Sequence, residues 1–159
     1  MKQQTEFAVA LITEGNEAGQ PAEFYKTATL ASILDFDQLD DGMLGITCRG
    51  TTIVDIGEQQ LQDDNLILGK MEPRLQHPLE NKSDNFFSIQ AFLRQVLDRE
   101  DLAEYRTQLK EDWNDPDWIS FRLSELLPIE SESKQVLLEK DTETRIDLLA
   151  EMLTKSKLI

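Results

Sequence analysis

The chain has 159 residues, a net charge of −15 at pH 7 and a pI near 4.4, with 40% hydrophobic and 7% aromatic residues. This length suits one domain, or two small ones, with a buried core. A surface this acidic repels phosphate backbones and anionic lipid heads, so we expect neither nucleic acid nor a membrane surface as a partner.

The sequence also predicts a cytoplasmic protein. A single cysteine, Cys48, allows no internal disulfide and fits a reducing compartment. No apolar run approaches the roughly 20 residues of a membrane span, and the N-terminus lacks the basic-then-apolar pattern of a signal peptide.

The first apolar segment is Phe7–Ile12, FAVALI. A continuous apolar run of this length predicts a strand that is buried on both faces, or the tail of a buried helix. The following residues, 14–21, contain Gly15, Gly19 and Pro21, which indicates a loop. Its glycines are too sparse for phosphate binding, and no Gly-Lys-Ser/Thr follows.

Residues 27–56 predict a meander of three strands. Three segments alternate or are rich in β-branched residues: Thr27–Phe36, Met43–Cys48 and Thr51–Ile56. Asp40-Asp41-Gly42 is typical of a turn, and Arg49-Gly50 is short enough for a tight hairpin. The second strand places Leu44, Ile46 and Cys48 on one face, so we expect Cys48 to be buried.

A fourth strand is expected over Asn65–Met71, ended by Pro73, which cannot extend a β-ladder. The polar stretch 75–84 has neither strand nor helix periodicity. It separates a β subdomain over residues 1–80 from an α-helical subdomain over residues 85–159. A β half followed by an α half is an α+β layout.

The second half predicts a helical bundle. The first helix starts near Phe86, with Asn85 or Ser88 as its cap; the apolar residues that share its helical spacing are Phe86, Ile89, Leu93, Val96 and Leu97. A short helix is expected over Leu102–Leu109. Asp115-Pro116 is a strong helix start, and Pro128 ends that helix. Two more helices are expected over Ser131–Lys140 and Asp141–Lys155.

We find no catalytic, metal or cofactor signature, so the sequence predicts a protein that is not an enzyme. One histidine, His77, and one cysteine cannot supply a four-ligand zinc site. A calcium loop beginning at Asp37 would need an acidic or amide side chain at Leu39 and a glutamate at Cys48. These patterns favour binding over turnover.

Two stretches resemble the N-terminal domain of the Lon ATP-dependent proteases, which also occurs as a stand-alone protein. The first is residues 29–54, with the Asp-Gly turn and the run LGITCRGTTIVDI. The second is more specific and spans the helical half; its matching residues are Asp117-Trp118, Arg122-Leu123-Ser124-Glu125-Leu126-Leu127-Pro128, Lys134-Gln135, Leu137-Leu138-Glu139, Arg145-Ile146 and Leu148-Leu149. The resemblance covers about residues 7 to 155.

The resemblance implies a PUA-like β-barrel joined to a helical bundle, and a role in recognising protein substrates. The family's ATPase and Ser–Lys peptidase modules do not fit in this chain, so we expect neither ATP hydrolysis nor peptidase activity. Our hypothesis is a module that binds unfolded or exposed polypeptide. The residues assigned to the contact flank the Asp-Gly turn: Phe36, Leu39, Met43 and Leu44. The alternative is an adaptor that binds one folded partner.

The chain departs from the family at its start. The family usually has a Pro-containing apolar strand and an Ile-Phe-Glu-x-Arg-Tyr segment before the position of Phe7. Either the start lies downstream of the natural one, or the barrel is built without these strands. An open sheet edge is a template for another chain, so we expect a homodimer with Phe7–Ile12 at or near the contact.

Trp118 is expected to be structural and to pack the bundle, because it lies at a helix start after Asp115-Pro116, in register with Phe121 and Arg122. Its replacement by alanine should then cost roughly 3–5 kcal/mol, the scale for a large core aromatic.

Overall fold

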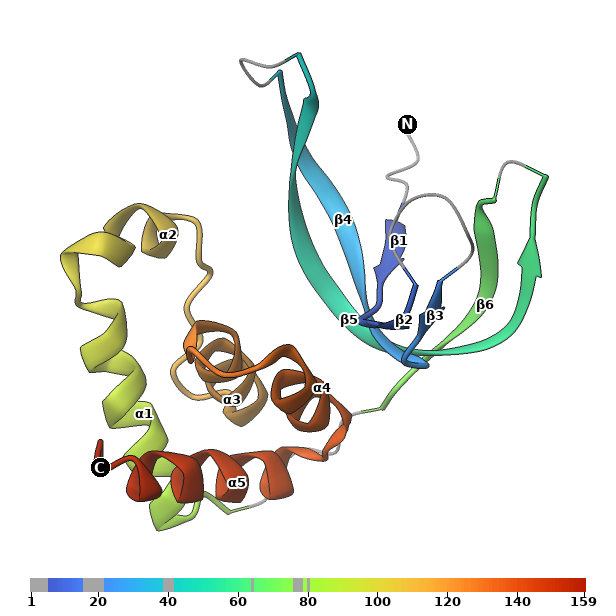
Figure 1. The fold of residues 1–159 in the computed structure, drawn as a ribbon. Helices are drawn as coiled ribbons and strands as arrows, with labels where there is room; N and C mark the ends of the chain where they lie inside the picture. Colours follow the sequence, from blue (N-terminus) through green and yellow to red (C-terminus); the bar gives the residue numbers. More distant parts are fainter. Residues whose placement is uncertain (1–5, 16–21, 39–41, 64, 76–78, 80) are drawn as a thin grey trace. The chain divides into compact units, whose positions relative to one another are not determined.

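The structure, a computed structural model, describes residues 6–15, 22–38, 42–63, 65–75, 79 and 81–159. The chain divides into two compact units, Met1–Leu75 and Gln76–Ile159. The first is built of strands and the second of helices (Figure 1).

The first unit contains the strands β1 (Glu6–Val9), β2 (Ile12–Glu14), β3 (Glu23–Phe24), β4 (Thr27–Gln38), β5 (Leu44–Leu61) and β6 (Ile67–Pro73). Four of them form an antiparallel sheet in the order β1-β4-β5-β6, and β2 pairs with β3. The expected strands at 27–36 and 65–71 are confirmed as β4 and β6. The expected closed barrel is wrong for the described residues, because β1 and β6 end the sheet without pairing with each other.

The Phe7–Ile12 run is divided between two sheets, with β1 ending at Val9 and β2 beginning at Ile12. Phe7 and Ala8 are half-buried and Val9 is exposed, so burial on both faces was a wrong expectation. β1 pairs on one side only, with Thr29–Ser32 of β4, among the described residues.

The expected hairpin at Arg49-Gly50 is also wrong. β5 runs without a turn from Leu44 to Leu61 and pairs with β4 along most of its length. The register shifts by one residue at Thr51, which forms a β-bulge. The Thr51 hydroxyl donates to the Leu30 carbonyl at 3.1 Å. The bulge accommodates Thr51 as an unpaired extra residue next to Gly50, and it bends the strand. The chain therefore does not need to reverse its direction here.

The core of the β unit is small and lies where β4 and β5 pair near their β1 and β6 neighbours. Its buried apolar residues are Ala28, Ala31, Ile53 and Val54. Arg74, just after β6, donates to both carboxylate oxygens of Asp55, at 3.1 and 2.7 Å, and to the Thr27 hydroxyl at 2.9 Å. These bonds tie the end of β6 to β4 and β5.

The second unit contains the helices α1 (Asp84–Leu97), α2 (Ala103–Thr107), α3 (Pro116–Leu126), α4 (Ser131–Glu139) and α5 (Thr142–Lys155), with a 3₁₀ turn over Glu100–Leu102. The Asp115-Pro116 start is confirmed, since the Asp115 carboxylate accepts from the Asp117 N–H at 2.9 Å. The cap of α1 is Ser83, which accepts from the Phe86 N–H, so the expected caps Asn85 and Ser88 are wrong.

Leucine-rich faces of four helices form the core of this unit. The buried residues are Phe86, Ile89, Leu93, Leu97, Ile119, Leu123, Leu127, Leu137, Ile146, Leu149, Ala150 and Leu153. The α1 residues that the helical spacing assigned to the core are buried, apart from Val96, which is half-buried. Trp118 is half-buried against this core, and its ring packs edge-on against that of Trp113, with centroids 5.2 Å apart.

Arg145 of α5 is fully buried and holds α3 and α5 together. Its guanidinium donates to Asp117 Oδ1 at 2.5 Å, to Ser120 Oγ at 2.9 Å and to the Lys140 carbonyl at 2.8 Å, and it stacks 3.5 Å from the Phe121 ring centre. Burial lowers the pKa of Arg145 to about 10, opposed by the nearby Asp117 carboxylate. At neutral pH the group is therefore charged, and each of its three nitrogens has a hydrogen-bond partner, as a buried cation requires.

Candidate functional site

The outer part of the β4–β5 hairpin is a two-stranded ribbon (Figure 1). β1 pairs with β4 only at 29–32, and β6 pairs with β5 only at 54–61. Within the described part of the chain, Ile33–Gln38 and Leu44–Cys48 therefore have only each other as strand partners. Two strands alone are marginally stable in water, so this ribbon depends on the sheet at its base.

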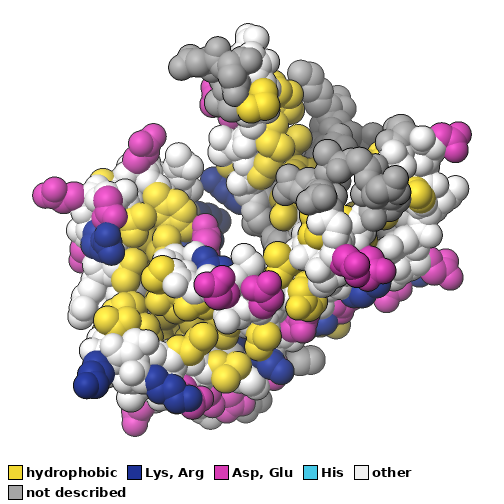
Figure 2. Space-filling model, in the orientation of Figure 1, with side chains coloured by type: hydrophobic (Ala, Val, Ile, Leu, Met, Phe, Trp, Pro, Cys, Tyr) yellow, Lys and Arg dark blue, Asp and Glu magenta, His cyan; other side chains and the backbone are white. Residues whose placement is uncertain are grey.

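One face of the ribbon is apolar and exposed. Phe36 lies directly opposite Ile46, and Leu44 is two residues along the same strand, so these three side chains share a face. They are 56%, 48% and 67% exposed, respectively. Figure 2 shows hydrophobic side chains gathered along this hairpin.

The opposite face of the ribbon is polar. Asp35 and Asp37 alternate with Phe36 along β4 and lie opposite Thr47 and Gly45 of β5. Both carboxylates are on exposed residues, and Asp35 Oδ1 accepts from the Phe36 N–H at 2.9 Å. The small side chain of Thr47 and the absent one of Gly45 leave these carboxylates open to solvent and to a ligand.

The local sequence explains why this ribbon forms. Strict alternation of apolar and polar residues favours a strand with two different faces, and Gly42, with φ +84°, takes the left-handed conformation that the reversal of the chain needs. In most sheets, other parts of the protein cover the apolar face that such alternation creates. A contiguous apolar face left in water is typical of an interaction surface.

Sequence reasoning assigned the contact to Phe36, Leu39, Met43 and Leu44. Phe36 and Leu44 lie on the apolar face, Met43 is exposed just before β5 begins, and Leu39 lies outside the described residues. The role of these residues in binding stays a prediction.

Two exposed apolar residues of the hairpin were missed as contact candidates. Ile46 completes the apolar face, and Leu34 is exposed beside the register shift in β4. The signal for Ile46 was present in the alternation of the second strand, but sequence reasoning assigned that face to the interior. For the same reason the expected burial of Cys48 is wrong: this residue is exposed, because nothing described covers the face.

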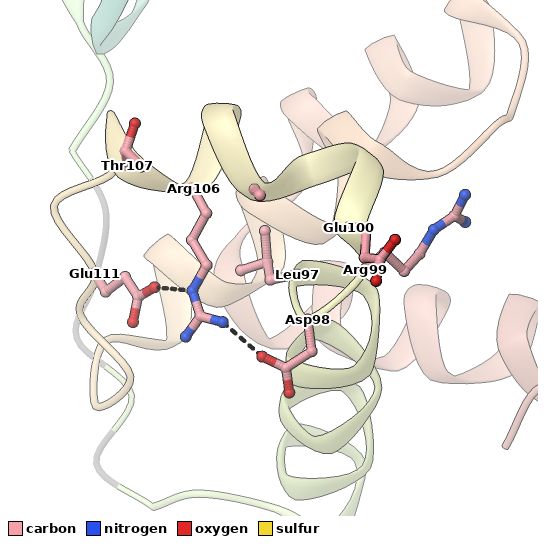
Figure 3. A pocket seen from close by; sticks show the side chains of 8 residues that line it. Leu97, Asp98, Arg99, Glu100, Arg106, Thr107 and Glu111 are labelled. Carbon is pink, nitrogen blue, oxygen red and sulfur yellow. Dashed lines mark hydrogen bonds and ion pairs between the residues drawn. The ribbon is translucent and has the colours of Figure 1, made fainter.

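An open pocket of about 520 Å³ lies in the helical unit, where α1 ends and α2 begins. Figure 3 shows Arg106 between two acidic side chains, bonded to Asp98 at 2.5 Å and to Glu111 at 2.8 Å. Glu111 also accepts from the Trp113 indole N–H at 2.6 Å. Asp98, Arg106 and Glu111 are therefore already paired with one another.

Other kinds of site find little support in the described part of the chain. No group of three or more His, Cys, Asp or Glu side chains comes together there as a metal site would require. His77 lies outside the described residues. None of the described helices is both long and apolar enough to cross a membrane.

Comparisons with known proteins bear on the whole chain. No curated protein matches the sequence. Among solved structures, a Lon N-terminal domain protein from Xanthomonas campestris is similar, with a TM-score of 0.66 and 24% identity over 91% of this chain and 74% of that one. The N-terminal domain of Mycobacterium avium complex Lon protease is also similar, with a TM-score of 0.59 and 17% identity over 93% of this chain and 89% of that one.

These likenesses show a mixed α/β chain with the fold of a Lon N-terminal domain. The model of the ATP-dependent protease La (LON) substrate-binding domain matches residues 1–155, nearly the whole sequence. The chain therefore belongs to the LON substrate-binding domain family.

Proposed function

We propose that this protein is a non-enzymatic binding module that recognises unfolded or exposed segments of other polypeptides, and that the apolar face of the β4–β5 ribbon makes the contact. Membership in a substrate-binding family supports the first part. The observation that carries the second is the exposure of Phe36, Leu44 and Ile46 on one face.

The physical basis is the free energy of burying apolar surface. Burying a fully exposed side chain of this size contributes on the order of 1.5–3 kcal/mol. Each of these three is about half exposed, so a partner that covers it gains about half of that. A partner that covers all three gains enough to offset part of the entropy lost in ordering an unfolded chain. A folded protein rarely presents an extended apolar segment, so the surface selects unfolded ones.

The test is a double substitution, Phe36→Thr with Ile46→Thr. Threonine keeps strand propensity, and both positions are exposed, so the fold should persist. We expect retention of a chemically denatured model protein to fall about tenfold or more, as the loss of two anchor residues implies. Phe87→Thr with Val136→Thr, at exposed positions of α1 and α4, removes a comparable amount of apolar surface from the other unit and should bind as the wild type does.

Wild-type binding by the double variant would contradict the proposed contact, provided that circular dichroism shows an intact sheet. Retention of one native protein from lysate, with no preference for denatured ones, would instead support the adaptor that was the alternative from the sequence.

The proposal includes an absence of turnover, because the family match is to the substrate-binding domain. We expect no hydrolysis of ATP or casein by the purified chain. Hydrolysis that a point substitution within the chain abolishes would overturn this expectation.

We also place the protein in the cytoplasm, because an exposed free thiol such as Cys48 suits a reducing compartment. We expect no binding to RNA at any salt concentration.

A further inference from the structure

The two faces and one edge of the β4–β5 ribbon together specify which kind of polypeptide segment the ribbon can bind. This inference rests on the proposed function and narrows it. We propose that the ribbon binds extended segments in which apolar residues alternate with lysine or arginine, and that such a segment pairs as an added strand along the Leu44–Cys48 edge of β5.

Beside the ribbon, β5 has an edge with which no described strand pairs. Over Leu44–Cys48, β5 pairs with β4 on one side, and β6 reaches β5 only from Val54 onward. No described residue pairs as a strand with the other side of this segment. A strand edge offers backbone N–H and C=O groups that an extended peptide can bond, which is β-augmentation.

The alternation of side chains along a strand decides which residues of the peptide face each side of the ribbon. A peptide paired beside β5 must place successive side chains on opposite faces of the ribbon. One set then lies beside Leu44 and Ile46 on the apolar face, where apolar side chains are favoured. The other set lies beside Gly45 and Thr47, on the face that carries Asp35 and Asp37.

Charge decides the identity of this second set. The charged residues of the described ribbon, Ile33–Gln38 and Leu44–Cys48, are Asp35 and Asp37, and Arg49 is the first basic residue beyond it. A strand added beside β5 is two strand spacings, about 10 Å, from β4, so only a long side chain can approach Asp35 and Asp37. Gly45 has no side chain in the way. Lysine and arginine have both the reach and the charge, while their apolar stems cover the surface between.

The same charges weigh against a second copy of this chain as the occupant. Two ribbons placed together would bring two sets of aspartates into one interface, and each whole chain carries a net charge of −15. Acidic peptides meet the same repulsion. Neutral peptides lose the electrostatic contribution but keep the apolar one.

The experiment uses the full chain and three peptides of equal length, in which valine alternates with lysine, with serine or with glutamate. We expect the Val/Lys peptide to bind most tightly, with an affinity that falls as salt rises from 50 to 500 mM, since exposed charge pairs are screened. Asp35→Asn with Asp37→Asn should weaken Val/Lys binding by about threefold to tenfold, the scale of two exposed ion pairs, and leave Val/Ser binding unchanged.

A matched control removes the same charge elsewhere. Glu23→Gln with Glu58→Gln takes two exposed acids from the β unit outside the ribbon. Its Val/Lys affinity should equal that of the wild type. Backbone amide exchange supplies a second readout, in which the Val/Lys peptide protects amides within Leu44–Cys48.

Each other outcome overturns the inference in a distinguishable way. Equal binding of all three peptides, lost in the Phe36→Thr and Ile46→Thr variant, would leave the proposed function standing and remove the charge selection. Loss of Val/Lys binding in the control would show an effect of overall charge. Dimerisation along Leu44–Cys48 would make a second copy the occupant. Failure to bind any peptide or any denatured protein would overturn the proposed function itself.

Discussion

Trp118 illustrates how a single residue divides its surface between core and solvent. Its ring packs against the helical core and against Trp113, and a smaller part of it stays accessible to solvent. We expect Trp118→Ala to lower the free energy of unfolding by about 3 kcal/mol, the lower end of the scale for large aromatics, because the ring is not fully covered. Denaturant titration measures this. The fully buried Leu149, changed to alanine, supplies the reference, and an unchanged midpoint for Trp118→Ala would mean that the ring is a contact residue.

Asp55 provides a pH-dependent contribution to stability. Hydrogen bonds from Arg74, and secondarily from Thr27, lower the pKa of Asp55 in the folded chain. A folded pKa below the unfolded one means that the contribution is present above about pH 4 and is lost as the pH falls through the folded pKa.

We expect Asp55→Asn to be less stable than the wild type at pH 7, by about 1 kcal/mol or less because the Asp55 and Arg74 side chains are partly exposed. The difference should narrow as the pH falls below about 4. Urea unfolding of both proteins from pH 7 to pH 3 gives the comparison. A constant difference over this range would show that the Asp55 charge is not what Arg74 stabilises.

At the scale of the element, β5 is one long strand in which two of the three glycines, Gly50 and Gly57, have different surroundings. A Cβ atom on Gly50 would lie 2.9 Å from Thr29 Cγ2 in β4, whereas one on Gly57 would lie 3.5 Å from the Lys70 carbonyl oxygen. The first contact requires a shift of a stiff, β-branched neighbour, and the second is ordinary.

We therefore expect Gly50→Ala to destabilise the chain by about 1–3 kcal/mol, as overpacking does. Gly57→Ala should be neutral, or stabilising by about 0.4–1 kcal/mol through the unfolded state. Thermal unfolding of the two variants separates these outcomes. Equal effects would contradict the pairing of Gly50 beside Ala31 and Thr29.

For the whole molecule, the expected homodimer remains a prediction. β1 stands at one end of the sheet and pairs only with β4 among the described residues. Such an edge can accept a strand from a second copy. We expect sedimentation at micromolar concentration to show a dimer, and salt to strengthen it, because two chains of charge −15 repel each other. A monomer at every salt concentration, with slow amide exchange along Phe7–Ile12, would exclude this contact.

The two units also differ in how their apolar residues are used. The helical unit buries its leucines in one cluster, while the β unit has a core of small or branched residues and leaves Phe36, Leu44 and Ile46 in water. Amide exchange should therefore be slower in α1 and α5 than in the ribbon, since local stability follows buried contact.

The sequence by itself determined those features that depend on neighbours along the chain. The helical spacing from Phe86 to Leu97 predicts the buried face of α1, and Asp115-Pro116 predicts the start of α3, because helix contacts and caps lie within one turn. The β-branched and apolar composition of Thr27–Phe36 likewise predicts β4, and alternation predicts one common face for Leu44 and Ile46.

The tertiary structure decided what alternation leaves open. Alternation gives a strand two faces, but whether a face is buried depends on which other elements cover it. Leu44, Ile46 and Cys48 have the pattern of core residues and lie exposed, because no residue of β1 or β6 in the described part of the chain pairs beside the ribbon. Arg49-Gly50 has the composition of a turn and becomes part of a bulged strand, because β4 continues beside it. The candidate site therefore depends on which strands pair with each other, and a local sequence pattern does not contain that information.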